Sequence, residues 1–293
     1  MAESGVAPGW EPHTVVTEER LDPGRVLALA SIFDDGLPPP AAGDPLPPLW
    51  HWAALPTWAS SSQLGVDGHP LRGGFLPPVE LPRRMFAGGS AVFDGELRVG
   101  ETVRREATVE SVTDKQGRSG PLVVVVTSTT LTGEHGSVTE KQNLIYREAA
   151  GSDSERGQSD PAPAAAMTPA GAPIAPAGPG TWEFRTDPTL LMRFSAATAN
   201  AHRIHYDWPY ATGVEGYPGL VVHGPLMTLA LLETHRLAGP PRRVAGLSHR
   251  NAAPLFCGQS ARLVSTPSDH GATVELMGPG GSGPHTTVDL TLE

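Results

Sequence analysis

The sequence predicts an α+β protein built from two related halves, each an antiparallel sheet wrapped around a helix. Three observations carry this prediction. A short pattern of small residues occurs twice in the 293-residue chain, strand-like segments follow each copy, and one strongly apolar helix lies in the second half. A hydrophobic content of 39% is enough for two cores of ordinary domain size. The helix of the second half is the better defined of the two.

The repeated pattern is the first observation. The two copies are Ala87-Gly88-Gly89-Ser90 with Leu97 and Gly100, and Ala245-Gly246-Leu247-Ser248 with Leu255 and Gly258. Each member of the second copy lies 158 positions after its counterpart. The segments that follow alternate between apolar and polar residues, which is typical of half-buried strands. They are residues 101–112, 121–131 and 138–147 in the first half, and 259–267, 272–277 and 285–292 in the second.

Two helices are predicted. Residues 225–237 begin at Gly224-Pro225 and end before Gly239, with Pro240 and Pro241 beyond, which are ordinary start and stop signals. Apolar residues cover nearly every side of this helix, so we expect it to be enclosed by a sheet. Residues 24–34 form a second candidate helix, which ends before a proline-rich stretch.

Composition divides the chain into two domains. Residues 149–180 are mostly Ala, Pro, Gly and Ser, and such a segment cannot bury enough apolar surface to offset the entropy of ordering it. We expect a disordered linker there. It separates an amino-terminal domain, residues 1–148, from a carboxyl-terminal domain, residues 181–293.

Charge and composition exclude several functions. The formal net charge is −10, without a basic stripe or a zinc-finger spacing, so nucleic-acid binding is not expected. No apolar run approaches the roughly 20 residues that cross a bilayer, and the acidic amino terminus lacks the features of a secretion signal. These observations predict a cytoplasmic protein. The single cysteine, Cys257, excludes an intramolecular disulfide and a thiolate metal cluster.

Chemistry is concentrated just before the enclosed helix. Asn200-Ala-His202-Arg-Ile-His205-Tyr-Asp207 precedes Val221-Val-His223-Gly224-Pro225. An imidazole titrates near pH 6.5, so His205 can both accept and release a proton at neutral pH. The first turn of a helix has backbone N–H groups without internal partners, which can bind an oxyanion. A base and an anion site therefore lie close together in the sequence.

These residues resemble the active-site stretch of MaoC-like (R)-specific enoyl-thioester hydratases and dehydratases. Further segments are similar to the two-domain branch that contains mesaconyl-CoA hydratases and type-2 hydroxyacyl-thioester dehydratases. They are Leu49-Trp50-His51-Trp52, Asp67-Gly68-His69-Pro70, Gly74-Phe75-Leu76-Pro77-Pro78 and Pro82-Arg83-Arg84-Met85. The resemblance implies a double hot-dog fold.

The resemblance also implies an activity: reversible hydration or dehydration of an enoyl or 3-hydroxyacyl thioester, a hydro-lyase reaction. His205 would be the catalytic histidine, and the Gly224 N–H would hold the thioester oxygen. The thiol would be CoA or an acyl-carrier protein, without a metal or a redox cofactor. The amino-terminal half would accommodate a bulky acyl group without a second catalytic centre. Family members commonly pair domains or subunits, so a homodimer is one expectation.

The chain departs from the family pattern at three positions. Asn200 stands where an aspartate is usual; it cannot accept a proton but can orient a water or a substrate hydroxyl. His202 replaces an asparagine and is either a second acid/base or a polar anchor. Arg203 replaces a proline and either holds a carrier phosphate or pairs with an acidic residue. Supporting roles are expected for Asp207 as a hydrogen-bond acceptor and for His223 as a buried, hydrogen-bonded group.

Other interpretations stay open from the sequence. Arg83 and Arg84 are candidate phosphate contacts. One alternative is a hot-dog protein that binds a carrier, or runs another biosynthetic reaction, without water chemistry. Another is a non-haem iron oxygenase in which His205 and Asp207 join His223 or His235 as a facial triad.

Overall fold

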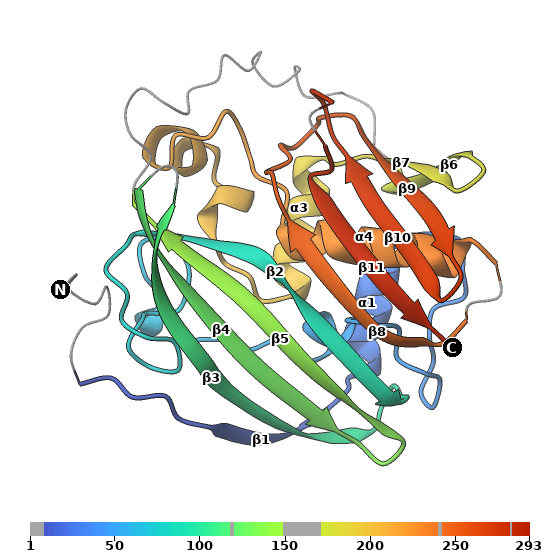
Figure 1. Cartoon of the computed structure of the whole chain (residues 1–293), viewed down its shortest axis with the longest axis horizontal. Helices are drawn as coiled ribbons and strands as arrows, with labels where there is room; N and C mark the ends of the chain where they lie inside the picture. Colours follow the sequence, from blue (N-terminus) through green and yellow to red (C-terminus); the bar gives the residue numbers. More distant parts are fainter. Residues whose placement is uncertain (1–8, 118–119, 149–170, 240–241, 282) are drawn as a thin grey trace.

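The computed structural model describes residues 9–117, 120–148, 171–239, 242–281 and 283–293 (Figure 1). All of its strands join one antiparallel sheet of 11 strands, in the order β1-β3-β4-β5-β2-β8-β11-β10-β9-β7-β6. The strands are β1 (Val15–Arg20), β2 (Arg83–Gly95), β3 (Thr102–Gly117), β4 (Gly120–Thr132), β5 (Gly136–Arg147), β6 (Ile174–Gly178), β7 (Thr181–Phe184), β8 (Val244–Asn251), β9 (Ala261–Ser268), β10 (Gly271–Met277) and β11 (Thr286–Leu292). The helices are α1 (Pro23–Phe33), α2 (His51–Ala54), α3 (Pro188–Ala197) and α4 (Gly224–Leu237), with short helical turns η1 (Ser61–Gln63), η2 (Arg203–His205) and η3 (Tyr210–Val214).

The two halves of the sheet meet where the repeated pattern lies. Strand β2 pairs with β8 from Gly88 opposite Arg250 to Val92 opposite Gly246, so that Ser90 faces Ser248. Those two serines are counterparts in the repeat, and each half continues outward through equivalent strands. The two copies of the repeat therefore pair with each other where the halves meet, as in a two-fold interface. This pairing of β2 residues 88–92 with β8 residues 246–250 is called the seam below.

Glycine is required at this seam. Gly88 has a φ of +135°, and a Cβ there would lie 2.2 Å from the carbonyl oxygen of His249 on the neighbouring strand. Only a residue without a side chain allows β2 and β8 to approach this closely while keeping that backbone conformation.

The long helix of the second half is as predicted. Helix α4 has Pro225 in its first turn, and every residue from Leu226 to Thr234 is buried. It packs against β9, β10 and β11 and reaches β2, and Figure 1 shows it running behind the second-half strands. The sheet encloses the helix because no side of it is polar enough to face water.

The first half is built differently around its sheet. Helix α1 confirms the helix predicted at 24–34, with Asp22 capping the N–H groups of Gly24 and Arg25, but it packs against α2 and α3. The segment facing the first-half sheet is α2, which has four residues. Hydrogen bonds from His51 and Trp52 to Glu140 of β5 hold α2 to the sheet. A short helix leaves space on this face of the sheet.

One boundary of the predicted linker needs correction. Residues 174–178, which we expected to be part of a disordered segment, form β6. They pair with β7, with Ile174 opposite Phe184, and both side chains are buried in the core, which stabilises the strand. Residues 149–170 lie outside the described residues, and the division into two domains stays a prediction.

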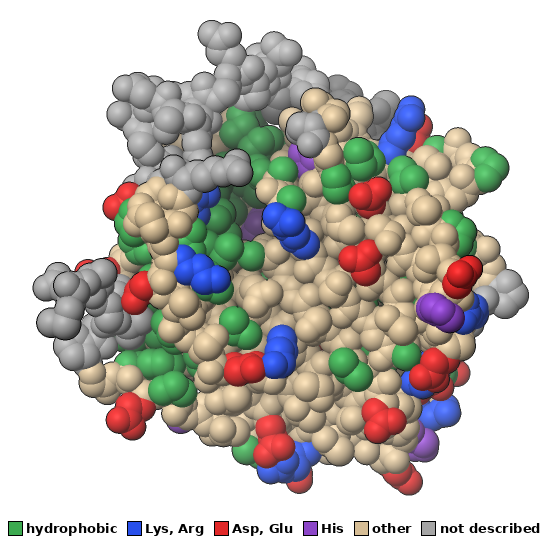
Figure 2. All heavy atoms as spheres, in the orientation of Figure 1, with side chains coloured by type: hydrophobic (Ala, Val, Ile, Leu, Met, Phe, Trp, Pro, Cys, Tyr) green, Lys and Arg blue, Asp and Glu red, His purple; other side chains and the backbone are tan. Residues whose placement is uncertain are grey.

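Charged side chains of both signs lie on the surface. In the face shown in Figure 2, basic and acidic side chains are interspersed. Within the described residues, none of the helices has the length and apolar character needed to span a membrane.

Candidate active site

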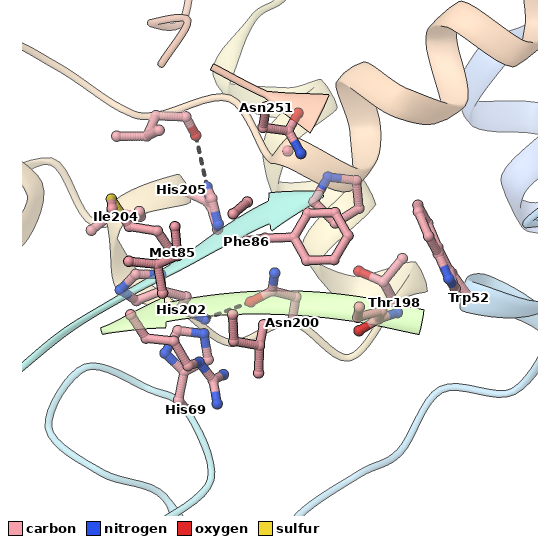
Figure 3. A pocket seen from close by; sticks show the side chains of 18 of the residues that line it. Trp52, His69, Met85, Phe86, Thr198, Asn200, His202, Ile204, His205 and Asn251 are labelled. Carbon is pink, nitrogen blue, oxygen red and sulfur yellow. Dashed lines mark hydrogen bonds between the residues drawn. The ribbon is translucent and has the colours of Figure 1, made fainter. Parts of the chain in front are cut away.

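A pocket of about 1060 Å³ lies between the first-half sheet and the start of α4. The first half contributes α2 and the inner faces of β2 to β5, including Phe86, Thr127 and Gln142. The second half contributes the loop before η2, the first turn of α4 and the end of β8 (Figure 3). Among the predicted site residues, the pocket brings together His205, Asn200, His202, Gly224, Arg83 and Arg84.

His205 is a buried imidazole that the structure holds in its neutral form. Its Nδ1 lies 2.7 Å from the carbonyl oxygen of Val221, which can only accept, so Nδ1 carries the proton. The ring's other end points into the pocket in Figure 3, leaving Nε2 as an acceptor. Burial, together with the nearby His202, lowers the pKa of His205 to about 3. At neutral pH the imidazole is therefore uncharged.

His223 packs against one face of the His205 ring. It caps α4, is fully buried, and its Nε2 lies 2.8 Å from the hydroxyl oxygen of Ser195. Its ring stacks on His205 with centroids 3.6 Å apart and an interplanar angle of 20°. Burial and the neighbouring histidines keep its pKa well below the usual range. It is the buried, hydrogen-bonded group that the sequence indicated, and its contacts fix the plane of His205.

Asn200 and His202 form the part of the pocket wall next to His205. The Oδ1 of Asn200 accepts the backbone N–H of His202 at 3.1 Å, which sets the orientation of the amide. The His202 ring meets His205 edge-on, with centroids 5.5 Å apart, and its Nε2 lies 3.5 Å from a carboxylate oxygen of Glu215. His202 is thus held between His205 and the carboxylate of Glu215.

The first half adds two side chains that we did not predict for this site. In the loop before β2, Asp67 Oδ2 lies 3.0 Å from His69 Nδ1, and the His69 ring packs 4.1 Å from that of His202. Burial, then the charge of Arg84, lowers the pKa of His69, while the hydrogen bonds from His69 keep the pKa of Asp67 low against the effect of burial. The Asp67-Gly68-His69 turn was the available signal, but only the tertiary packing shows where it points.

The start of α4 lies on the wall of the pocket. Gly224 lines the pocket, and a Cβ at this position would lie 3.2 Å from Phe86 Cδ1 and 3.1 Å from Asn251 Nδ2. Its backbone N–H belongs to the first turn, where the partial positive charge of the helix is greatest. Pro225 follows and has no N–H. A small residue is therefore needed here for an oxygen to approach the backbone.

The two arginines of β2 differ in their partners. Arg83 Nη2 donates to the Tyr217 hydroxyl at 2.8 Å, and its Nε lies 3.5 Å from Glu215. Arg84 is half-buried near His69, and desolvation lowers its pKa while Tyr146 and Asp67 act in the opposite direction. Both line the pocket.

Arg203 and Asp207 lie outside the pocket lining. They form an ion pair of 2.7 Å, Asp207 also accepts the Tyr210 N–H, and the Arg203 guanidinium lies over the Tyr210 ring. The pair fixes the shape of the loop that carries His205. A contact of Arg203 with a carrier phosphate finds no support in this arrangement, because the guanidinium is already engaged.

The facial triad considered from the sequence is wrong. Asp207 is held by Arg203, and His235 Nε2 lies 3.0 Å from the Arg242 carbonyl oxygen, at the other end of α4. Within the described residues, the grouping of His and acidic side chains close enough to share a metal ion is Asp67, His69 and His202, whose ligand atoms lie within 4.8 Å. None of the proposed triad residues belongs to it.

Comparison with known proteins identifies the family. Residues 49–257 match the model of hydroxyacyl-thioester dehydratase type 2. The chain belongs to this family. A mesaconyl-C(4)-CoA hydratase of Chloroflexus aurantiacus is 42% identical over 285 residues, covering 97% of this chain and 96% of that protein. A mitochondrial hydroxyacyl-thioester dehydratase type 2 of Schizosaccharomyces pombe is 36% identical over 85 residues, 28% of each chain.

Solved structures agree on the fold of this type 2 dehydratase family member. HtdX of Mycobacterium tuberculosis superposes with a TM-score of 0.63 at 19% identity, covering 96% of this chain and 100% of HtdX. A conserved hypothetical protein of the same organism, described as a double hotdog fold, has a TM-score of 0.53 at 15% identity, with 98% and 96% coverage. The expected double hot-dog fold and the hydratase/dehydratase class are therefore confirmed.

Proposed function

We propose that the protein reversibly hydrates an enoyl-CoA thioester, with His205 as the acid/base and the Gly224 N–H on the thioester oxygen. The observation that carries this proposal is the shared pocket. His205 is hydrogen-bonded to Val221, three residues before Gly224, and His205 and Gly224 line the same cavity. Family membership and the 42% identical mesaconyl-C(4)-CoA hydratase support the reaction class.

The proposed chemistry needs one proton carrier. The His205 Nε2 takes a proton from a water molecule as the water oxygen bonds to Cβ of the substrate. The Cα=Cβ electron pair moves to Cα, and negative charge develops on the thioester oxygen beside Gly224. The same proton then passes from His205 to Cα, restoring the neutral imidazole. Dehydration is the reverse sequence.

Asn200 has a positioning role in this proposal. Its Oδ1 is committed to the His202 N–H, so its Nδ2 is the atom left to donate to the water or to the substrate hydroxyl. An amide cannot replace the usual aspartate as a proton carrier, and for this reason the proton is assigned to His205 in both directions. His202 is assigned as the polar anchor that holds the loop against Glu215.

The acyl group is proposed to occupy the first half. Residues 1–148 would form the domain that accommodates it, because α2 leaves the inner face of the sheet open, and residues 181–293 would carry the acid/base group. Thr127, Thr129 and Gln142 line this space together with the apolar side chains of Leu131, Leu144 and Ile145. The thiol would be CoA or an acyl-carrier protein, with Arg83 and Arg84 as anion contacts, and the reaction uses neither a metal nor a redox group. We propose further that two copies pair in a symmetric homodimer, which analytical ultracentrifugation tests.

The test is direct incubation with thioesters. Purified protein is mixed with crotonyl-CoA, mesaconyl-C4-CoA and longer enoyl-CoA esters, and products are read by mass. Gain of one water on at least one ester, together with its loss from the matching 3-hydroxyacyl-CoA, is the expected result. If no ester gains or loses water, the result would favour the alternative, a protein of this fold that binds thioesters without water chemistry.

A further inference from the structure

The anion site at the start of α4 has one donor fewer than its position suggests. Gly224 supplies an N–H, but Pro225 at the next position cannot. Sites that stabilise a developing oxyanion generally aim more than one donor at the oxygen. A second donor near Gly224 would therefore have to come from elsewhere in the fold.

Asn251 stands at that place. It is the last residue of β8, lies opposite Thr286 of β11, and lines the pocket. The Thr286 hydroxyl donates to its Oδ1 at 2.9 Å, which turns the Nδ2 away from β11. The Nδ2 lies 3.1 Å from the position that a Gly224 Cβ would take. In Figure 3 Asn251 lies on the same side of the pocket as His205, with its amide nitrogen toward the interior.

The amide nitrogen is also left without a partner. Within the described part of the chain, Asn251 Nδ2 is buried and makes no hydrogen bond. Burying a donor in this way costs free energy, so such groups in folded proteins call for an explanation. An oxygen atom of a bound substrate would satisfy it, and the site beside Gly224 is where the proposed reaction puts that oxygen.

We propose that Asn251 Nδ2 is the second donor to the thioester oxygen and completes, with the Gly224 N–H, a two-donor oxyanion site. This inference rests on the proposed function. As water adds to Cβ, charge moves onto the oxygen, and both hydrogen bonds strengthen, so the interaction favours the transition state over the bound substrate. The side-chain amide replaces the backbone N–H that Pro225 lacks.

The decisive variant is Asn251→Ala, assayed with the ester that the wild type hydrates. We expect kcat to fall by about 100-fold, as for other single oxyanion donors, with KM changing less than about threefold. Asn251→Asp keeps the acceptor for Thr286 but has no donor, so it should lose at least as much. Thr286→Val frees the amide to rotate and should show a smaller loss, about three- to tenfold. Asn143→Ala changes an asparagine on the opposite face of β5, outside the pocket lining, and should match the wild type.

A spectroscopic readout separates a donor from a structural residue. The carbonyl stretch of a bound, 13C-labelled enoyl-CoA should lie at higher frequency in Asn251→Ala than in the wild type, because one hydrogen bond is lost. The corresponding alkenyl-CoA thioether lacks the oxygen and should bind both proteins equally. If the wild type hydrates the ester and Asn251→Ala keeps the wild-type kcat and carbonyl frequency, this inference is overturned. The proposed function is unaffected by that result. If Asn251→Ala binds the thioether more weakly than the wild type does, Asn251 has a structural role, and that result would also overturn the inference.

Discussion

His205 is held neutral by its surroundings rather than by a charged partner. Its Nδ1 is fixed by a backbone carbonyl, its face is covered by His223, and burial opposes its protonation. A carboxylate five residues earlier would have favoured the charged form, but Asn200 stands there. The result is an imidazole that stays neutral throughout the neutral pH range.

This arrangement predicts the pH dependence of the rate. The active form is the neutral imidazole, and its pKa of about 3 means that it stays neutral as the pH falls from 8 to 5. We expect kcat/KM with the hydrated ester to be flat across that range. An acid limb centred between pH 6 and 7, which is removed in His205→Gln, would contradict a depressed pKa at this residue.

Gly224 gives a second prediction at the residue scale. In Gly224→Ala the new Cβ lies within 3.2 Å of both Phe86 and Asn251 and occupies the approach to the backbone N–H. We expect kcat/KM to fall at least about 100-fold, with a change in unfolding free energy of about 1 kcal/mol, since the backbone there is helical. Gly213→Ala is the matched control, because nothing lies within 4 Å of its Cβ. If Gly224→Ala is as active as Gly213→Ala, the proposed role of the Gly224 N–H is wrong.

At the scale of elements, the sequence predicted those whose signals are local. Helix α4 was predicted by Gly224-Pro225 at its start and by the glycine beyond its end, and β3 to β5 and β9 to β11 by alternation. Strands β2 and β8 were missed because glycine is unusual in strands, and these glycines are explained by a close approach from the other half of the chain. Helix α3 was missed although Asp187 caps it, because it is only 10 residues long.

The same distinction applies to the site. His205 and Gly224 could be predicted because they are 19 positions apart on one continuous segment. His69 and Asn251 could not, because each reaches the pocket through packing between segments that are distant in sequence. His69 comes from a first-half loop and meets His202, and Asn251 is placed by the pairing of β8 with β11.

Strand β8 also carries a pH-dependent element. His249 is buried against Phe86 and Trp52, and burial lowers its pKa to about 4. Because this value is below that of the unfolded chain, protonation favours unfolding: the stability is fully present above about pH 6.5 and falls as the pH falls toward 4. Between pH 7 and 5 we expect this residue to account for a loss of about 2 kcal/mol.

Urea unfolding of His249→Gln measures that contribution. The variant should lose about 2 kcal/mol less than the wild type between pH 7 and pH 5, whatever its stability at pH 7. The comparison uses the difference between two pH values, so a packing defect at position 249 cancels. If the unfolding free energies of the two proteins fall by the same amount between pH 7 and pH 5, His249 keeps an ordinary pKa in the folded state.

At the scale of the whole molecule, the seam between β2 and β8 makes one sheet out of two halves. The pocket depends on it, because Phe86 lies on β2 and Asn251 on β8, on either side of that seam. Among the described residues, no long helix packs against the first-half sheet, whereas α4 lies behind the second-half strands (Figure 1). The cavity is lined by the first-half sheet on one side and by the start of α4 on the other.

Gly88→Ala tests the seam. The added Cβ would lie 2.2 Å from a backbone oxygen of β8, at a φ that a residue with a side chain rarely adopts. We expect a loss of roughly 3 kcal/mol or more in unfolding free energy, or failure to fold. Gly74→Ala, where nothing lies within 4 Å, should unfold like the wild type in a thermal melt. Equal melting temperatures for both variants would show that β2 and β8 do not approach this closely.

The most direct test of the central claim follows oxygen from solvent into product. Wild-type protein and His205→Gln are incubated with mesaconyl-C4-CoA and crotonyl-CoA in 18O-labelled water, and the hydroxyacyl-CoA formed is analysed by mass. We predict one labelled oxygen per product with the wild type and a rate at least about 1000-fold lower with His205→Gln, whose fold and thioester binding are retained. Undiminished label incorporation by folded His205→Gln would contradict the assignment of His205 as the acid/base.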